Sequence, residues 1–190
     1  FTVRRTLLAV LAASAACVSL PAFASKEKPV IGFSIDDLRV ERWARDRDYF
    51  IAAAKGLGAE VSVQSADGDS AKQVAQIENL ISKKVDVLVI VPKDQSTLTN
   101  VLKEAKKAGI KVVSYDRLIK SPDVDVYISF DNYRVGQMQG AALMKALPKG
   151  SIYVMSGDPG DNNAKLFKAG ALSEIDPFVK KGDIKILGEQ

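Results

Sequence analysis

The segment VDVLVIV (residues 85–91) is the most informative about the fold, because its residues from Val87 to Val91 are apolar without a break. A strand of this composition is typical of a parallel sheet that helices cover on both faces. Short β-branched runs of the same kind alternate with longer helical patterns along the chain, as they do in right-handed βαβ units. The sequence therefore predicts an α/β fold built on doubly wound parallel sheets.

The same alternation of hydrophobic period predicts the other elements. Further strands are expected at 29–35, 60–65, 110–115, 125–130, 151–156 and 183–188. Helices are expected over 41–57, 70–83 and 163–180, with two more that begin at caps formed by Ser96 and Asn132. Gly58 is expected to stop the first helix, Asp69 or Ser70 to cap the second, and Pro177 to interrupt the last.

One connection is too short for this pattern. Only Asp116 to Val124 separates the strands predicted at 110–115 and 125–130, which leaves no room for a crossover helix. We therefore expect the chain to pass into a second lobe here, with a hinge near Ser129–Asn132. Residues 25–129 would then form an N-terminal lobe, and residues 130–190 would begin a C-terminal lobe.

The first 24 residues are predicted to be a cleaved export signal. Arg4 and Arg5 precede an apolar run over 7–20, and Ala22-Phe23-Ala24 supplies the small residues that signal peptidase requires. The run is short for a membrane span. The chain opens on a residue other than Met and ends just after a strand-like run, so we expect it to be the N-terminal portion of a longer exported protein.

Composition excludes several classes of function. The chain carries 27 basic and 23 acidic residues, and two of the basic ones lie in the predicted signal, so its charge is mild and mixed. Such a balance argues against a nucleic-acid surface. The chain has no His, and its one Cys, Cys17, lies in the signal, which excludes His-based nucleophilic catalysis and His-ligated metals within these residues. No cofactor or metal is expected.

Polar side chains gather where the predicted strands end. Ligands of open parallel sheets bind outside the carboxyl ends of the strands. The residues expected at that edge are Asp36, Asp37, Asp67, Lys93, Asp94, Asp116, Arg117, Asp131, Asn132, Asp158 and the loop 160–165. Carboxylates, amides and guanidinium groups together suit the hydroxyls of a neutral polyol. No glycine-rich phosphate loop is present, so a nucleotide is not expected.

Each candidate has a structural alternative that the residues alone leave open. Trp43 could be a core residue in the same stripe as Phe50, or it could stack on a sugar. The neighbours Asp116 and Arg117 could form a structural ion pair. Asp131-Asn132 is better explained as a cap and hinge than as a ligand contact. Asp36-Asp37 is similar to the acidic pair of a phosphoacceptor pocket, which the export signal argues against.

Several longer motifs support a more specific interpretation. The blocks IGFSIDDLRVERW (31–43), YISFDN (127–132) and DNNAKLFKAG (161–170) are the most informative, with VQSADGD, QIENLI, VDVLVIVP and YDR between them. Over 29–190 the chain resembles the N-terminal part of the periplasmic D-xylose-binding proteins of ATP-binding-cassette importers, within the ribose/galactose-binding group.

This resemblance implies a type I periplasmic binding protein fold, in which two similar α/β lobes joined by three crossings close on a sugar. Only the start of the second lobe would lie in this chain, and further sugar contacts would lie beyond Gln190. The resemblance implies six site residues from the two lobes: Arg42, Trp43, Asp116, Arg117, Asp161 and Asn163.

The function implied is a periplasmic receptor, not an enzyme, that captures a monosaccharide and delivers it to the membrane permease. D-xylose is the expected ligand, although the sequence leaves other pentoses and hexoses open, and a monomer is expected. One alternative is a sugar-sensing module for a chemoreceptor or histidine kinase. Another is an exported carbohydrate-active enzyme in which Asp116 and Asp161 flank the sugar.

Overall fold

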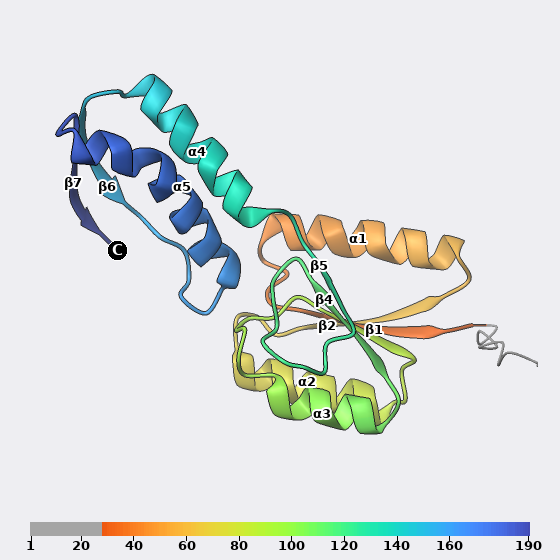
Figure 1. Cartoon of the computed structure of the whole chain (residues 1–190). Helices are drawn as coiled ribbons and strands as arrows, with labels where there is room; N and C mark the ends of the chain where they lie inside the picture. The colour runs from red at the N-terminus through yellow and green to blue at the C-terminus, as the bar shows by residue number, and fades with distance from the viewer. Residues whose placement is uncertain (1–27) are drawn as a thin grey trace, which may run out of the picture.

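The computed structural model describes residues 28–190, so the predicted signal at 1–24 and Cys17 lie outside the described residues. Five parallel strands form the first sheet (Figure 1). In spatial order they are β2 (Glu60–Ser65), β1 (Val30–Ile35), β3 (Val87–Ile90), β4 (Lys111–Tyr115) and β5 (Val126–Ile128). The predicted strands are present with small changes at their ends.

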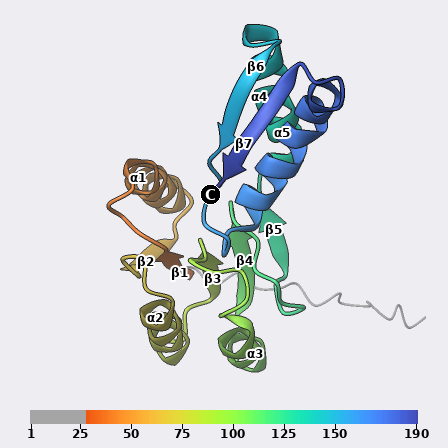
Figure 2. The same ribbon diagram turned by 90° about the vertical axis from the view of Figure 1, so that its left-hand side faces the viewer.

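Helices cover this sheet on both faces, as predicted. Helix α1 (Glu41–Gly56) lies on one face, and α2 (Ser70–Ser82) and α3 (Thr99–Lys107) lie side by side on the other (Figure 2). Leu88 and Ile90 pack into the core beneath α2 and α3, whereas Val89 and Val91 pack with the α1 face. Alternate residues of β3 therefore enter two different cores, which explains why the whole strand is apolar.

The connection between β4 and β5 corrects the expectation drawn from its length. β5 is the next parallel strand of the same sheet and pairs with β4, so the chain does not leave the first sheet before β5. The crossover is an irregular loop in place of a helix. Its residue Ile119 is buried in the core beside α3, and the Ile119 backbone N–H donates to Ser114 Oγ at 3.0 Å. A buried loop residue thus does the packing that a crossover helix usually does.

Two predicted helix caps are wrong by a few residues. Ser96 does not cap α3, which begins at Thr99 without a side-chain cap; instead, Asp94 accepts the backbone N–H of Ser96 at 2.7 Å in the preceding turn. For α4 (Asn132–Ala146) the cap is Asp131, whose carboxylate accepts the N–H of Arg134 at 3.0 Å. Aspartate at both places accepts the free backbone donors.

The other predicted helix boundaries are confirmed. Asp69 caps α2 by accepting the N–H groups of Ala71 and Lys72 at 2.8 and 3.0 Å. Gly58 follows α1 with φ +80°, the left-handed conformation that glycine adopts most easily.

Beyond β5 the chain forms a smaller α/β unit. Helix α4, strand β6 (Gly150–Val154), helix α5 (Asn162–Lys180) and strand β7 (Ile184–Glu189) follow in order, and β6 and β7 pair in parallel. α5 runs on through Pro177 to its end, so the predicted interruption is wrong. Pro177 has no N–H to donate to the Ser173 carbonyl, so α5 lacks this one bond and ends within a turn, at Lys180. The hinge predicted near Ser129–Asn132 stays a prediction; β5 ends and α4 begins there.

Close contact between α4 and α5 depends on glycine. A Cβ atom added to Gly170 would lie 2.1 Å from the backbone oxygen of Tyr133, and one added to Gly136 would lie 2.2 Å from that of Phe167. The two helix backbones therefore approach at a distance that a larger residue would prevent. Among residues 28–190, no helix is long and apolar enough to span a bilayer.

Candidate ligand-binding site

The six predicted site residues come from three places along the chain. Arg42 and Trp43 stand in the first turn of α1, Asp116 and Arg117 directly follow β4, and Asp161 and Asn163 lie at the N-terminal end of α5. These are the segments at which the smaller unit meets the carboxyl edge of the first sheet (Figures 1 and 2). The structure brings all six into one connected set.

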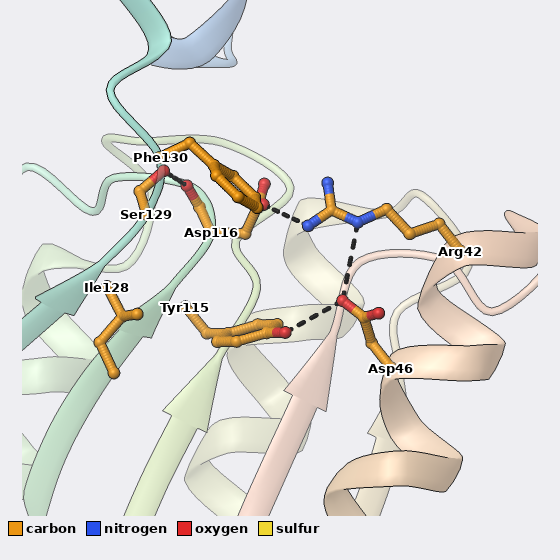
Figure 3. Close-up of a pocket in the computed structure, with 7 residues that line it drawn as sticks. All are labelled: Arg42, Asp46, Tyr115, Asp116, Ile128, Ser129 and Phe130. Atoms are coloured by element: carbon orange, nitrogen blue, oxygen red, sulfur yellow. Dashed lines mark hydrogen bonds and ion pairs between the residues drawn. The ribbon is translucent and has the colours of Figure 1, made fainter.

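Asp116 is at the centre of the first half of this set. Its carboxylate pairs with Arg42 Nη2 at 2.5 Å (Figure 3), and Asn163 Nδ2 donates to Asp116 Oδ1 at 3.2 Å and to the Asp116 carbonyl at 3.1 Å. Asp116 and Asn163 are both buried. A residue after β4 and a residue of α5 are thus joined directly.

The backbone of Asp116 is held in an uncommon conformation. Its φ is +62°, in the left-handed region that few residues other than glycine adopt. Its N–H donates to the Ile128 carbonyl at 2.7 Å, and its carbonyl accepts from Ser129 Oγ at 2.6 Å. Surrounding bonds of this kind are what keep such a conformation populated, and they fix the direction of the Asp116 carboxylate.

Arg117 connects the remaining residues of this set, Asp161 and Trp43. Its Nε lies 3.2 Å from Asp161 Oδ2, and the second oxygen of Asp161 accepts the N–H of Asn163 at 2.9 Å as the cap of α5. The guanidinium carbons of Arg117 and Arg42 lie 5.5 and 4.4 Å from the centre of the Trp43 ring. The contacts therefore run from Arg42 through Asp116, Asn163, Asp161, Arg117 and Trp43 back to Arg42. We call these six residues the polar ring.

Trp43 is mainly a core residue in this structure. Its side chain is 3% exposed and packs with Phe33, Val89 and Val91, so the core interpretation holds, while stacking on a sugar stays a prediction. The alternative of an ion pair between Asp116 and Arg117 is not what residues 28–190 show: Asp116 pairs with Arg42, and Arg117 pairs with Asp36 and Asp161.

Sequence reasoning placed Asp36 at this edge without its role, and it missed Asp46. Asp36 and Asp46 each hold one arginine: Asp36 Oδ2 lies 2.7 Å from Arg117 Nη1, and Asp46 Oδ2 lies 3.6 Å from Arg42 Nε. The i,i+4 spacing of Arg42 and Asp46 on one helix was the available signal for the second pair. Nothing in the sequence connects Asp36 with Arg117, which lies far along the chain.

Two further polar residues complete this support. Tyr115 donates its hydroxyl to Asp46 at 3.0 Å, and burial together with that bond raises the pKa of the Tyr115 phenol. Asn132 donates to Asn163 Oδ1 at 2.9 Å and to Ser129 Oγ at 3.0 Å. Asn132 was expected to be a cap; its buried amide instead orients Asn163.

A second contact joins the two parts of the chain away from the ring. Lys93, after β3, pairs with Asp158, after β6, at 2.5 Å, and the N–H of Gln95 donates to the Gly160 carbonyl at 3.1 Å. The ion pair lowers the pKa of Asp158 and raises that of Lys93. Asp37 takes no part in either contact: it pairs with Arg39, whose hydrogen bonds lower the pKa of Asp37 to about 2.

Two cavities are lined in part by residues of the ring. One of about 420 Å³ is lined by the seven residues drawn in Figure 3: Arg42, Asp46, Tyr115, Asp116, Ile128, Ser129 and Phe130. The other, of about 480 Å³, includes Arg117, Asp158 and Asp161 in its lining. Both volumes are of the size that small-molecule sites have. Within residues 28–190, no three acidic, Cys or His side chains are grouped to hold a metal ion.

Comparison with known proteins identifies the family. Residues 31–190 match the family described as the periplasmic binding protein domain. The chain belongs to this family. The expected type I periplasmic binding protein fold is thereby confirmed, and the family and its matching relatives are described as binding proteins rather than enzymes.

Two curated relatives of this binding protein domain carry the same name. The D-xylose-binding periplasmic protein of Escherichia coli is 50% identical over 186 residues, which cover 98% of this chain and 56% of that protein. The protein of that name from Haemophilus influenzae is 52% identical over 160 residues, which cover 84% of this chain and 48% of that protein. The predicted resemblance is confirmed, and the chain spans about half the length of these relatives.

A solved structure gives the same picture of the fold. An ABC transporter solute binding protein from Clostridium phytofermentans, crystallised with β-D-glucose, aligns with a TM-score of 0.80 at 39% identity. The alignment covers 83% of this binding protein chain and 51% of the solved one.

Proposed function

We propose that residues 28–190 form the N-terminal part of a periplasmic receptor that captures D-xylose between two lobes and delivers it to the permease of an ABC importer. The proposal rests on one observation: the polar ring joins side chains from both parts of the chain at one place. Identity of 50–52% to two D-xylose-binding periplasmic proteins supports the choice of sugar.

The charge of the site disfavours an anionic ligand. Asp116 and Asp161 of the ring and the supporting Asp36 and Asp46 place four carboxylates around two guanidinium groups, and Asn163 can both donate and accept. An anion would add to this excess of negative charge in a partly buried place, which costs free energy. A neutral polyol exchanges hydrogen bonds with the ring without changing its charge.

Sugar binding is then an exchange of partners. The ring residues are bonded to one another in this structure, so sugar hydroxyls must replace some of these bonds as both acceptors and donors. A hydrogen bond to a charged group contributes roughly 1.5–3 kcal/mol. We expect residues 25–190 alone to bind sugar weakly or not at all, because the chain spans about half the length of its relatives and the resemblance implies further sugar contacts from the other half.

We also propose that the protein reaches the periplasm through a cleaved signal at 1–24, based on the basic, apolar and small-residue pattern of this segment. Amino-terminal sequencing of the protein recovered from the periplasm tests this. An amino terminus close to Ser25 is expected, and recovery of the uncleaved chain in the cytoplasm would contradict it.

The sugar assignment is tested by thermal unfolding of the complete receptor with a panel of neutral sugars and sugar acids. D-xylose is expected to raise Tm most, because a ligand stabilises the state that binds it. Sugar acids are expected to have little effect. A shift with acids but not with neutral sugars would contradict the proposal, and turnover of an aryl xyloside would indicate an enzyme instead.

A further inference from the structure

Asp36 is a buried carboxylate that the proposed site does not yet explain. It follows β1 directly, and its side chain is 8% exposed. One oxygen, Oδ2, lies 2.7 Å from Nη1 of Arg117. The other oxygen, Oδ1, is buried without a hydrogen-bond partner among residues 28–190. Burying a carboxylate costs free energy, and the pair with Arg117 compensates only one of its two oxygens. The buried position of Asp36 therefore needs an explanation.

The geometry of Arg117 supplies that explanation. Nη1 is held by Asp36 and by the Pro92 carbonyl at 3.2 Å, while Nε is held by Asp161 at 3.2 Å. A guanidinium group is planar, so fixing two of its nitrogens fixes the plane in which every other N–H lies. Asp36 and Pro92 belong to the five-stranded part of the chain, whereas Asp161 belongs to the smaller unit. The anchor on the sheet side is therefore independent of the smaller unit.

Asp36 is also the more buried of the two supporting carboxylates. The Arg117–Asp36 pair has side-chain exposures of 20% and 8%, whereas the Arg42–Asp46 pair has 48% and 22%. Attraction between charges is screened less in the interior than at the surface. The orientation of Arg117 therefore depends more on its partner than the orientation of Arg42 does.

We propose that Asp36 is a positioning residue for sugar binding, which fixes the plane of the Arg117 guanidinium before the sugar arrives. This role rests on the proposed function of the polar ring. A positioning role differs from a general structural role, because Asp36 then affects sugar affinity only by orienting Arg117. Removing the Asp36 carboxylate should weaken sugar binding only while Arg117 is present.

Calorimetric titration of the complete receptor with D-xylose tests this role. The set is the unmodified protein, Asp36→Asn, Arg117→Ala and the double variant. We expect Asp36→Asn to weaken binding by roughly tenfold, as expected for the loss of one charged hydrogen bond. The double variant should bind no more weakly than Arg117→Ala alone. Two residues that act as a unit are non-additive in this way.

The neighbouring residue provides a matched control. Asp37→Asn removes a carboxylate that pairs with Arg39, outside the ring, and should leave D-xylose affinity unchanged. Asp36→Glu keeps the charge but moves it by one methylene, and it should still weaken binding if position matters. If Asp36→Asn does not fold, Asp36→Glu tests the positioning role in its place.

The outcomes separate the role of Asp36 from the proposed function. Unchanged affinity in Asp36→Asn, or in Asp36→Glu where the Asn variant does not fold, would overturn the positioning role while leaving the sugar site intact. So would a loss of equal size with and without Arg117. If the unmodified receptor binds no neutral sugar, the proposed function fails and the role of Asp36 fails with it.

Discussion

Within residues 28–190, the two parts of the chain both contribute to the polar ring but differ in how much packing surrounds them. The first sheet, β2-β1-β3-β4-β5, has helices on both faces and two buried clusters. The β6–β7 sheet has α4 and α5 on one face (Figure 2), and its side chains Tyr153 and Leu187 are exposed, as is Met155 directly after β6. Its core cluster consists of Met144, Ile175 and Ile184 with a few partly buried neighbours.

The difference bears on how the ring is built. Arg42 lies on α1, and Asp116 and Arg117 directly follow β4, so all three belong to the sheet that is packed on both faces. Asp161 and Asn163 stand on α5, which is supported chiefly by α4 and by contacts back to the first part. The sheet side of the site is therefore expected to be rigid, and the α5 side is expected to depend on the packing of α4 and α5.

We expect the largest loss of stability when a leucine of the first sheet, rather than one of the β6–β7 sheet, is replaced by alanine. Leu88→Ala empties a fully buried place in β3 and should lower the free energy of unfolding by about 2–5 kcal/mol. In a chain of residues 28–190, Leu187 of β7 is exposed, so Leu187→Ala in that chain should change the free energy of unfolding by less than about 0.5 kcal/mol. Urea denaturation of both variants measures this. Equal losses would mean that the β6–β7 face is covered in solution.

The next prediction concerns the contact between α4 and α5. Gly170→Ala places a methyl group 2.1 Å from the Tyr133 carbonyl and should destabilise the protein by about 1–3 kcal/mol. Gly56→Ala, at the end of α1, meets nothing within 4 Å and should stabilise the helix by about 0.5–1 kcal/mol.

Hydrogen exchange locates the effect of these glycine variants. Gly170→Ala should raise exchange in α4 and α5 and leave the five-stranded sheet unchanged. A uniform increase across both parts would show that they unfold as one unit.

A third prediction takes one ring residue from each part. In the complete receptor, Arg42→Ala and Asn163→Ala should each weaken pentose binding by roughly tenfold or more, which corresponds to about 1.4 kcal/mol. Matched controls are Arg45→Ala, whose arginine pairs with Glu41 instead, and Asn162→Ala at the first position of α5. Near-normal affinity in both ring variants would remove these residues from the site.

The smallest expected effect concerns the link between the parts at Lys93 and Asp158. The pKa of Asp158 is below its ordinary value of 3.8, mainly because it accepts a hydrogen bond from Lys93. The contribution of this pair to stability is therefore complete above the ordinary pKa and is lost as pH falls through the lowered one. It is expected to be about 0.5 kcal/mol or less, because both groups are partly exposed.

Asp158→Asn tests this pH dependence. Stability should differ between the variant and the unmodified protein at pH 6 and converge in strong acid. A difference that grows as the solution is acidified would contradict the assignment.

Most of the fold could be predicted because hydrophobic period is a local property. The apolar run in β3 and the stripes of α1 and α2 are visible without knowledge of the tertiary structure. The place of β5 could not be predicted in this way. Its short connection looked incompatible with a parallel neighbour, whereas Ile119 lets a loop cover the core.

The site was only partly predictable for a related reason. The ring residues lie at strand ends or helix starts, where both the motif and the sheet topology indicate a ligand. Asp36 and Asn132 support those residues through contacts between segments far apart in the sequence. Which polar residue supports which becomes visible only when the segments have been brought together.

In the proposed site, a neutral sugar takes the place of the bonds within the polar ring. A crystal structure of the complete receptor with D-xylose would show whether this exchange occurs. We predict sugar hydroxyls within hydrogen-bond distance of Asp116 and Arg117 on one side and of Asn163 on the other. A sugar bound elsewhere, with the ring residues still bonded to one another, would contradict it.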